Sequence, residues 1–282
     1  MILIADSGST KTDWRLLTES GTLTQARTVG FNPYFQDAGG IAAELASSLK
    51  LAINEPVTHV HYYGTGCGTA DKCAVVEQAI RTVFPEAAEV QVASDLLGAA
   101  RALCGHEVGI ACILGTGSNS CYYDGQQIGY QVPNLGFWLG DEGSGGHLGK
   151  TLVTHYLLKE LAPDLEAKFE KRFPQTTRDV VLENAYKKPF PNRYFASFSK
   201  FLFDHRSHPQ AYKLVYDSFD LFFQKYICKY QDYRQLKVHF TGSVAFYYSD
   251  ILRQVANDRG VTLKNILETP IAGLALYHAK ES

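Results

Sequence analysis

The feature that most constrains this chain is a pair of glycine-rich turns, each of which follows a short apolar run. The first turn spans residues 6–13 (DSGSTKTD) after the apolar run 2–5, and the second spans residues 115–120 (GTGSNS) after the apolar run 110–114. Short apolar runs that end at such turns are typical of buried strands. Because a hairpin pattern follows each turn, the sequence predicts an internally duplicated α/β architecture.

The residue types in both turns are those that bind phosphate. Glycine has no Cβ, so backbone N–H groups can converge on an anion, and the Ser and Thr hydroxyls add further donors. One loop of this kind occurs in many folds and carries little information. Two of them, each bracketed by strands, indicate a nucleotide whose phosphates are held between two lobes.

The rest of the pattern alternates strands and helices. Apolar runs predict strands at 2–5, 14–17, 23–29, 57–63, 90–92, 108–114, 121–123, 127–130 and 236–240. Helical periodicity predicts helices at 39–53, 71–84, 243–258 and 271–280, with Asp71 as the N-cap of the second, and mostly helix between 144 and 230. Phenylalanines between 194 and 233 recur at helical spacing without a basic stripe, which predicts core packing rather than base stacking.

Composition excludes several classes of protein. With 282 residues, 45% of them hydrophobic, the chain is long enough for two domains with sizeable cores. The net charge of −2 gives no reason to expect nucleic acid or an anionic membrane as a partner. No apolar run reaches the roughly 20 residues of a membrane span, and the first residues lack the basic segment of a signal peptide. The chain has six cysteines, and their spacing is not that of metal ligands. We therefore expect reduced thiols and a cytoplasmic protein.

Three aspartates stand where a phosphoryl-transfer site needs carboxylates. Asp6, Asp95 and Asp141 each lie at a predicted strand end or glycine turn. Phosphoryl transfer from ATP requires donors around the phosphates, a metal that bridges them and a carboxylate that accepts the hydroxyl proton. A lone Asp in such a place is more often a helix cap or turn former. Together with two phosphate-type turns, the three favour the catalytic interpretation.

Five motifs together resemble those of one family. They lie at 6–13, 94–100, 114–119, 140–144 and 240–245. In this order they are similar to the first phosphate motif, the segment of the catalytic base, the second phosphate motif, the stretch that follows it and the adenosine-side motif of BadF/BadG/BcrA/BcrD-type ATPases. These ATPases include N-acetylglucosamine kinases and belong to the sugar kinase, Hsp70 and actin superfamily. The likeness covers nearly the whole chain, and the pair at 114–119 and 140–144 is its most specific part.

The resemblance implies a set of residues for ATP. Asp6 would hold Mg²⁺, through water. Two groups would contact the phosphates: Ser9, Thr10 and Lys11 from the first turn, and Gly115, Thr116, Gly117 and Ser118 from the second. Gly242 and Ser243 would lie against the adenosine. ATP and Mg²⁺ are therefore the implied cofactors.

The resemblance also implies a sugar site. Asp95 would be the general base that accepts the proton of the sugar hydroxyl. Further sugar contacts would come from Asn32, Thr65, Gly66, Asn119 and Asp141. The implied reaction is ATP-dependent phosphorylation of an amino sugar, N-acetylglucosamine to its 6-phosphate, so the implied partner is a small-molecule sugar. The oligomeric state stays open, a homodimer included.

The fold implied by the resemblance is a duplicated ribonuclease H-like, or actin-like ATPase, α/β fold with two lobes around a nucleotide cleft. On this chain it gives an N-terminal lobe at 1–106, joined by the C-terminal helix 271–282. The C-terminal lobe then spans 107–270.

Departures from the family pattern leave alternatives open. Leu135 stands about where the animal enzymes have a tryptophan near the sugar, so the identity of the hexosamine is open. An ATP-driven activator of a 2-hydroxyacyl-CoA dehydratase or benzoyl-CoA reductase shares the fold but needs cysteines for an iron–sulfur cluster, whereas Cys112 and Cys121 lie in apolar strand patterns. A sugar sensor without turnover is the other alternative. The sequence shows neither the helix-turn-helix nor the Cys/His zinc loop of related repressors.

Overall fold

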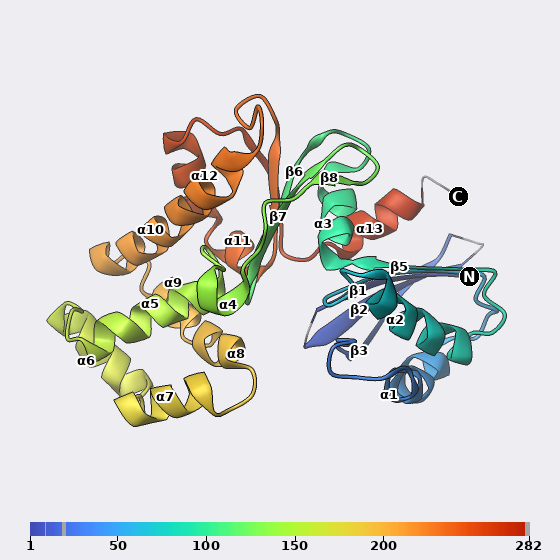
Figure 1. The fold of residues 1–282 in the computed structure, drawn as a ribbon, viewed down its shortest axis with the longest axis horizontal. Helices are drawn as coiled ribbons and strands as arrows, with labels where there is room; N and C mark the ends of the chain where they lie inside the picture. Colours follow the sequence, from blue (N-terminus) through green and yellow to red (C-terminus); the bar gives the residue numbers. More distant parts are fainter. Residues whose placement is uncertain (9, 19–20, 280–282) are drawn as a thin grey trace. The chain divides into compact units, whose positions relative to one another are not determined.

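The computed structural model describes residues 1–8, 10–18 and 21–279, and the chain divides into two compact units. Unit 1 comprises Met1–Glu107, Gly125–Ile128 and Thr269–Ser282, and unit 2 comprises Val108–Asp124 and Gly129–Glu268. Each unit contains one five-stranded sheet of mixed direction with its own helices (Figure 1). Among the described residues, no helix has the length and apolar character that crossing a membrane requires.

The sheet of unit 1 has the order β3-β2-β1-β4-β5. Its strands are β1 (Ile2–Ser7), β2 (Lys11–Leu17), β3 (Leu23–Val29), β4 (His59–Gly64) and β5 (Glu89–Ser94). The first three form antiparallel neighbours, as predicted for a hairpin around Gly21, whereas β1, β4 and β5 run parallel. The carboxyl ends of β1, β4 and β5 therefore meet at one edge of the sheet.

Helices cover both faces of this sheet. They are α1 (Ala38–Glu44), α2 (Ala70–Val83), α3 (Asp95–Cys104) and α13 (Ile271–His278). Side chains alternate between the two faces: Leu3 and Ala5 pack in the core that includes Ile80 of α2, whereas Ile4 packs with Leu274 of α13. Because every second residue of β1 is buried on each side, its run of apolar residues is continuous.

The sheet of unit 2 repeats the plan with the order β10-β9-β6-β7-β8. Its strands are β6 (Gly109–Leu114), β7 (Ser118–Tyr123), β8 (Ile128–Tyr130), β9 (Val238–Thr241) and β10 (Leu263–Leu267). Strands β6 and β7 are antiparallel, and β6, β9 and β10 are parallel. A glycine turn joins β6 to β7, as the first glycine turn joins β1 to β2 in unit 1.

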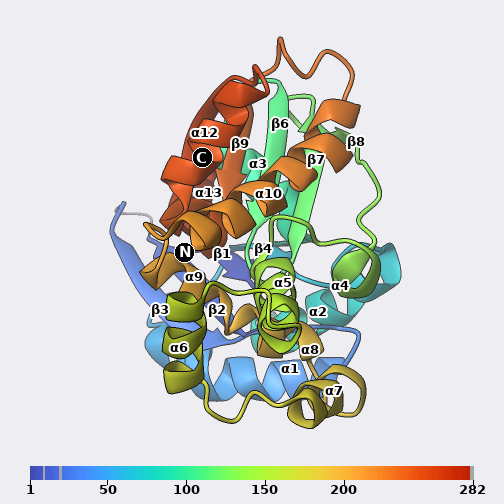
Figure 2. The same ribbon diagram turned by 90° about the vertical axis from the view of Figure 1, so that its left-hand side faces the viewer.

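Unit 2 carries most of the helices, as the sequence between 144 and 230 predicts. They are α4 (Gly136–Leu139), α5 (Gly145–Leu157), α6 (Pro163–Arg172), α7 (Arg178–Tyr186), α8 (Pro191–Ala196), α9 (Ser199–Asp204), α10 (Pro209–Lys225), α11 (Ser243–Tyr247) and α12 (Ser249–Asp258). Figure 2 shows α10 lying along the sheet, where Phe222 and Phe223 meet Phe240 of β9 with ring centroids 6.0 and 5.9 Å apart. These phenylalanines are fully buried, which confirms their expected role in the core.

Several element boundaries differ from the prediction. Asp71 is not the N-cap of α2, because Thr69 adopts the extended cap conformation and its hydroxyl donates to the Asp71 carboxylate. The predicted helix 243–258 is broken at Tyr248, which is buried and donates its hydroxyl to the Ser199 carbonyl at 2.6 Å. Strand β10, with five residues, and helix α4, with four, were not predicted.

Candidate active site

The first glycine turn closes the hairpin between β1 and β2. The Gly8 N–H donates to the Lys11 carbonyl at 3.0 Å, and the Ser7 and Thr12 hydroxyls are 2.7 Å apart. Thr10 and Lys11 are exposed, as a phosphate contact requires. Ser9, which the resemblance assigns to the same role, lies outside the described residues.

Lys11 is held by a carboxylate that the sequence did not single out for this role. Its Nζ lies 2.8 Å from Oδ2 of Asp13, while Nε of Arg27 on β3 lies 2.6 Å from Oδ1. Burial acts to raise the pKa of Asp13, but the hydrogen bonds from both cations outweigh it and lower that pKa. Lys11 must therefore exchange Asp13 for a phosphate, or share it, to take its expected role.

Two carboxylates lie near one another at the carboxyl edge of the unit 1 sheet. Asp6 is the residue before the last of β1, and Asp95 begins α3 directly after β5. Burial, followed by the negative charges of Asp95 and Asp13, raises the pKa of Asp6 to about 7. Burial also raises the pKa of Asp95, whose Oδ2 accepts a hydrogen bond from the Thr65 hydroxyl at 2.8 Å. Two acids that repel one another at a half-buried position fit a divalent cation, which takes oxygen ligands.

The loop after β4 joins Asn32 to this acidic pair. A Cβ on Gly66 would lie 2.7 Å from Oδ1 of Asn32, and Gly66 has a φ of +84°, so glycine is required there. The Thr65 N–H donates to the Ser7 carbonyl at 2.9 Å, which ties the loop to the end of β1. Oδ1 of Asn32 accepts the Tyr34 N–H at 3.0 Å. The NH₂ group of Asn32 is thus the part of its amide best suited to a sugar oxygen.

The second glycine turn is held from both sides by backbone hydrogen bonds. The Gly115 N–H donates to the Gly117 carbonyl at 2.9 Å, so in this structure it is engaged within the turn. The N–H groups of Gly145 and Gly146, at the start of α5, donate to the Gly115 and Thr116 carbonyls at 2.8 and 3.0 Å. Thr116 stays exposed. The motif at 140–144 therefore leads into a helix whose first turn fixes the phosphate-type loop.

Asp141 also contacts this turn. Its Oδ1 accepts the N–H of buried Ser118 at 3.0 Å, and a Cβ on Gly117 would lie 3.0 Å from its Oδ2. The backbone of Asp141 has a φ of +61°, an uncommon conformation for a residue with a side chain. Burial raises the pKa of Asp141 despite the Ser118 hydrogen bond. The structure thus brings Asp141 to the second turn.

Asn119 and the motif at 240–245 complete the predicted residues of unit 2. Oδ1 of Asn119 accepts Nε2 of Gln131 at 2.8 Å and the Ser120 N–H at 2.9 Å. Gly242 has a φ of +111°, and a Cβ there would lie 2.3 Å from the Leu114 carbonyl oxygen. Only glycine allows the end of β9 to pass so close to the end of β6. Ser243 follows as the exposed first residue of α11.

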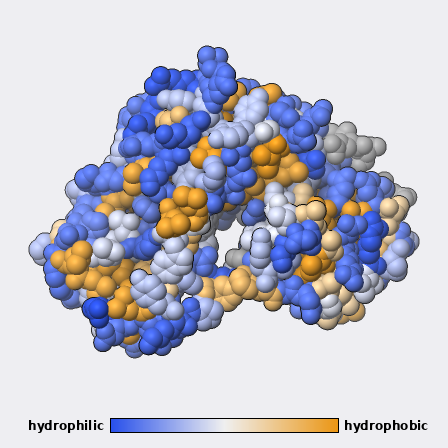
Figure 3. All heavy atoms as spheres, viewed as in Figure 1, coloured by the Kyte–Doolittle hydropathy of each residue, from blue (hydrophilic) through white to orange (hydrophobic). Residues whose placement is uncertain are grey.

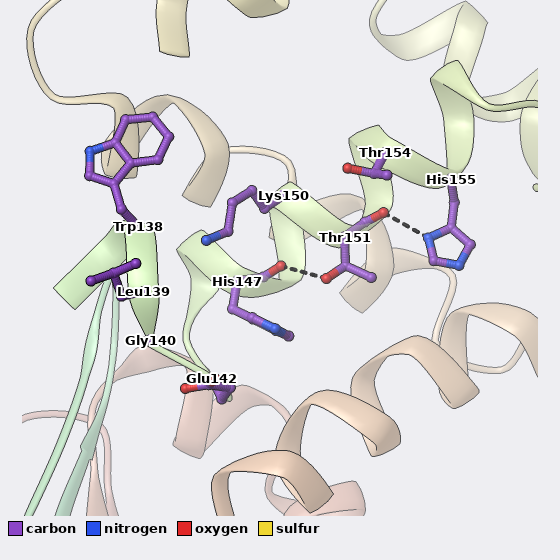
Figure 4. A pocket seen from close by; sticks show the side chains of 9 residues that line it. All are labelled: Trp138, Leu139, Gly140, Glu142, His147, Lys150, Thr151, Thr154 and His155. Carbon is purple, nitrogen blue, oxygen red and sulfur yellow. Dashed lines mark hydrogen bonds between the residues drawn. The ribbon is translucent and has the colours of Figure 1, made fainter. Parts of the chain in front are cut away.

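Unit 2 also has a pocket that sequence reasoning missed. It has a volume of about 350 Å³ and is lined by Trp138, Leu139, Gly140, Glu142, His147, Lys150, Thr151, Thr154 and His155 (Figure 4). Its polar side chains come mainly from one face of α5, at positions three and four residues apart. That spacing after the motif at 140–144 was the available signal.

The structure therefore groups the predicted residues within each unit. In unit 1 it brings together Asp6, Asp95, Thr65, Gly66 and Asn32, and it places Lys11 on the first turn beside Asp13. In unit 2 it groups the second turn with Asp141 and Gly242.

Comparison with known proteins gives one family. No protein-family model and no curated protein matches the chain. Among solved structures, a candidate N-acetylglucosamine kinase from Porphyromonas gingivalis is 43% identical over 99% of both chains, with a TM-score of 0.93. A candidate N-acetylglucosamine kinase from Chromobacterium violaceum is 19% identical over 98% of both chains, with a TM-score of 0.73, and shares the fold. The chain therefore belongs to the N-acetylglucosamine kinase-like family, and its two five-stranded mixed sheets with their helices have the duplicated, ribonuclease H-like α/β fold that was expected.

Proposed function

We propose that this chain is a sugar kinase that transfers the γ-phosphoryl group of ATP to an amino sugar, most directly N-acetylglucosamine to its 6-phosphate. The observation that carries the proposal is the 43% identity over 99% of the chain to a candidate N-acetylglucosamine kinase. The acidic pair Asp6 and Asp95 beside the Thr65–Gly66 loop supports it independently, because phosphoryl transfer needs carboxylates next to the acceptor.

In this proposal Asp95 is the general base. Its carboxylate accepts the proton of the sugar hydroxyl as that oxygen bonds to the γ-phosphorus, and the bond to the ADP oxygen breaks. The Thr65 hydroxyl donates to Oδ2 of Asp95, which fixes the orientation of the carboxylate. The NH₂ group of Asn32, together with Gly66, would position the sugar in unit 1. Asn119 and Asp141 would contribute from unit 2.

Asp6 would hold Mg²⁺ through water. When bound, the ion neutralises the phosphate charge and the repulsion between Asp6 and Asp95. The proposed phosphate contacts are Thr10, Lys11, Gly115, Thr116, Gly117 and Ser118, and Ser9 belongs to the same turn as Thr10 and Lys11. Gly242 and Ser243 are the proposed adenosine contacts.

We further propose that the chain forms two lobes, one at 1–106 with 271–282 and one at 107–270. The partner is a small-molecule sugar, and the enzyme acts in the cytoplasm. A homodimer is proposed as the form to test first by light scattering.

A coupled assay tests the proposed function. Purified protein is incubated with ATP, Mg²⁺ and N-acetylglucosamine, N-acetylmuramic acid, glucosamine or glucose, with release of ADP as the readout. Mass spectrometry then identifies the phosphorylated product. Phosphorylation of an amino sugar supports the proposal, and absence of any sugar phosphate contradicts it. A brown, iron-containing protein purified without oxygen would favour the electron-transfer activator instead.

A further inference from the structure

The pocket on α5 has a size and position that fit a small ligand. Its volume of about 350 Å³ lies in the range of small-molecule sites. All of its lining residues belong to unit 2, and two of them, Gly140 and Glu142, flank Asp141 in the chain. Figure 4 shows the Lys150 side chain extending from α5 toward Trp138 and Leu139.

Lys150 brings a positive charge to this pocket without a close acid. Its Nζ donates to the Phe137 carbonyl at 2.6 Å and lies 4.5 Å from the centre of the Phe137 ring. Over the part of the chain that the structure describes, no ion pair of Lys150 with a carboxylate is found within 4.0 Å. Burial lowers the pKa of Lys150, and the negative charges of Asp141 and Glu142 oppose that shift only in part. Because an ammonium group has three N–H donors, two remain for a ligand.

The acids near Lys150 are engaged elsewhere. Glu142 is buried, forms an ion pair with Lys225 and accepts the Tyr226 hydroxyl at 3.0 Å. Burial acts to raise the pKa of Glu142, but the hydrogen bonds from Lys225 and Tyr226 outweigh it, so Glu142 stays a paired anion. Asp141 accepts the Ser118 N–H on the second turn. Both oxygens of Glu142 and Oδ1 of Asp141 are therefore engaged by groups other than Lys150.

His147 adds a neutral donor to the same pocket. Ser218 Oγ accepts the Gly143 N–H at 3.1 Å and lies 2.8 Å from Nδ1 of His147, a pair in which either group can donate. Burial lowers the pKa of His147, which keeps the ring neutral at pH 7. When the Ser218 hydroxyl donates to Nδ1, the ring proton is on Nε2, which is then a hydrogen-bond donor toward a ligand. The side-chain groups available to a ligand are thus mainly donors.

Trp138 supplies an apolar wall. Its side chain is 53% exposed, and its ring stacks on Tyr186 of α7 with centroids 5.7 Å apart and planes 5° from parallel. A ring held in this way by a second ring offers one fixed face. A Trp side chain with this exposed fraction can pack against the apolar face of a sugar ring. Figure 3 shows that apolar residues reach the viewed surface at several places among hydrophilic ones.

We propose that this pocket binds the anionic group of a small sugar, with Lys150 and Nε2–H of His147 as donors and Trp138 against the sugar ring. The inference rests on the proposed function for the sugar part of the ligand and deepens it, because it assigns an acidic amino sugar or a sugar phosphate to this unit. A carboxylate carried by the acceptor and the phosphate of the product share this chemistry, and the experiment below separates them.

Binding is measured by calorimetry on the full chain without nucleotide. The probes are N-acetylmuramic acid, which carries a carboxylate, N-acetylglucosamine 6-phosphate, and neutral N-acetylglucosamine as the reference. Wild-type protein should bind at least one anionic sugar more tightly than the neutral one. Lys150→Met should weaken that binding by about 10- to 100-fold, because a charge-assisted hydrogen bond is lost. Lys150→Arg, which keeps the charge, should retain most of it.

Lys168→Met is the matched control, since Lys168 is exposed on α6 of the same unit and pairs with Asp164 at 3.4 Å. It should bind all three sugars as the wild type does. A loss confined to N-acetylmuramic acid assigns the site to an acidic acceptor, and a loss confined to the 6-phosphate assigns it to the product. Equal wild-type affinity for charged and neutral sugars, or unchanged anion binding in Lys150→Met, overturns the proposal.

The two proposals fail separately. Selective anion binding without phosphoryl transfer to any sugar would remove the kinase function and keep the pocket. Transfer to an amino sugar without anion selectivity would keep the kinase and remove the pocket.

Discussion

The two glycine turns have the same place in their sheets but differ in how they are held. The second turn is fixed by α5 and Asp141, which engage its backbone N–H and carbonyl groups. Charged side chains lie in and beside the first turn: Lys11 and Arg27 share Asp13, and Asp6 lies near Asp95. Unit 2 thus presents a rigid loop, whereas unit 1 presents charged groups whose pairing a ligand can change. This difference predicts that the chemical step depends on the acids of unit 1. The shape of the phosphate-type loop depends instead on the glycines of unit 2.

The largest expected effect is on Asp95 in unit 1. Asp95→Asn keeps the shape and the contact with Thr65 but removes the proton acceptor. We expect kcat to fall by about 10²- to 10⁴-fold with the KM for ATP little changed. Steady-state kinetics with the sugar identified in the screen measure this. Retention of kcat within a few-fold would show that Asp95 is not the base.

The next effect concerns the rigid loop of unit 2. Gly242→Ala would place a Cβ 2.3 Å from the Leu114 carbonyl oxygen at a φ of +111°. We expect a loss of roughly 2–4 kcal/mol in the free energy of unfolding, because neither backbone can move without breaking the sheet. Denaturant titration measures it. Gly260→Ala is the control, since its φ is +64° but nothing lies within 4 Å, and it should cost about 1 kcal/mol.

A smaller effect is expected for Asn32, which belongs to the sugar side of unit 1. Asn32→Ala removes the NH₂ donor and also the acceptor for the Tyr34 N–H. We expect kcat/KM for the sugar to fall by roughly 10- to 100-fold, mainly through KM, because an unpaired hydroxyl in a closed site costs about 1–3 kcal/mol. The KM for ATP should stay nearly constant. An equal rise in both KM values would indicate a general disturbance of unit 1.

The smallest effect is a pH dependence of unit 1 stability. Burial, with His61 and Arg101 nearby, lowers the pKa of His278 on α13 to about 3, from 6.5. The unfolded chain therefore binds a proton at a higher pH than the folded one, so this contribution is present above pH 6.5 and is lost as the pH falls toward 3. We expect a loss of about 1–2 kcal/mol between pH 6.5 and about pH 5.

His278→Gln tests that assignment, because glutamine does not titrate in this range. Unfolding curves at several pH values should show a flatter dependence for the variant than for the wild type. The same slope in both proteins would assign the pH dependence to other groups.

The sequence by itself determined the positions of the chemistry. Glycine turns after apolar strands, and the aspartates at strand ends, follow from local pattern, because the carboxyl ends of parallel strands meet at one edge. The strands of both sheets except β10 were predicted from their apolar runs. The burial of the Phe residues of α10 also follows from their helical spacing.

Only the tertiary structure decided which atoms are engaged. Lys11 is held by Asp13, the Gly115 N–H is used inside its own turn, and Oδ1 of Asn32 binds the Tyr34 N–H. The pairing of Glu142 with Lys225, and with it the surplus of donors beside Lys150, depends on a residue 83 positions away in the chain. The first three contacts join residues two positions apart, where the sequence allows several turn conformations and the folded structure selects one. The Glu142–Lys225 contact joins distant segments, so it exists only once the helices and sheet have packed.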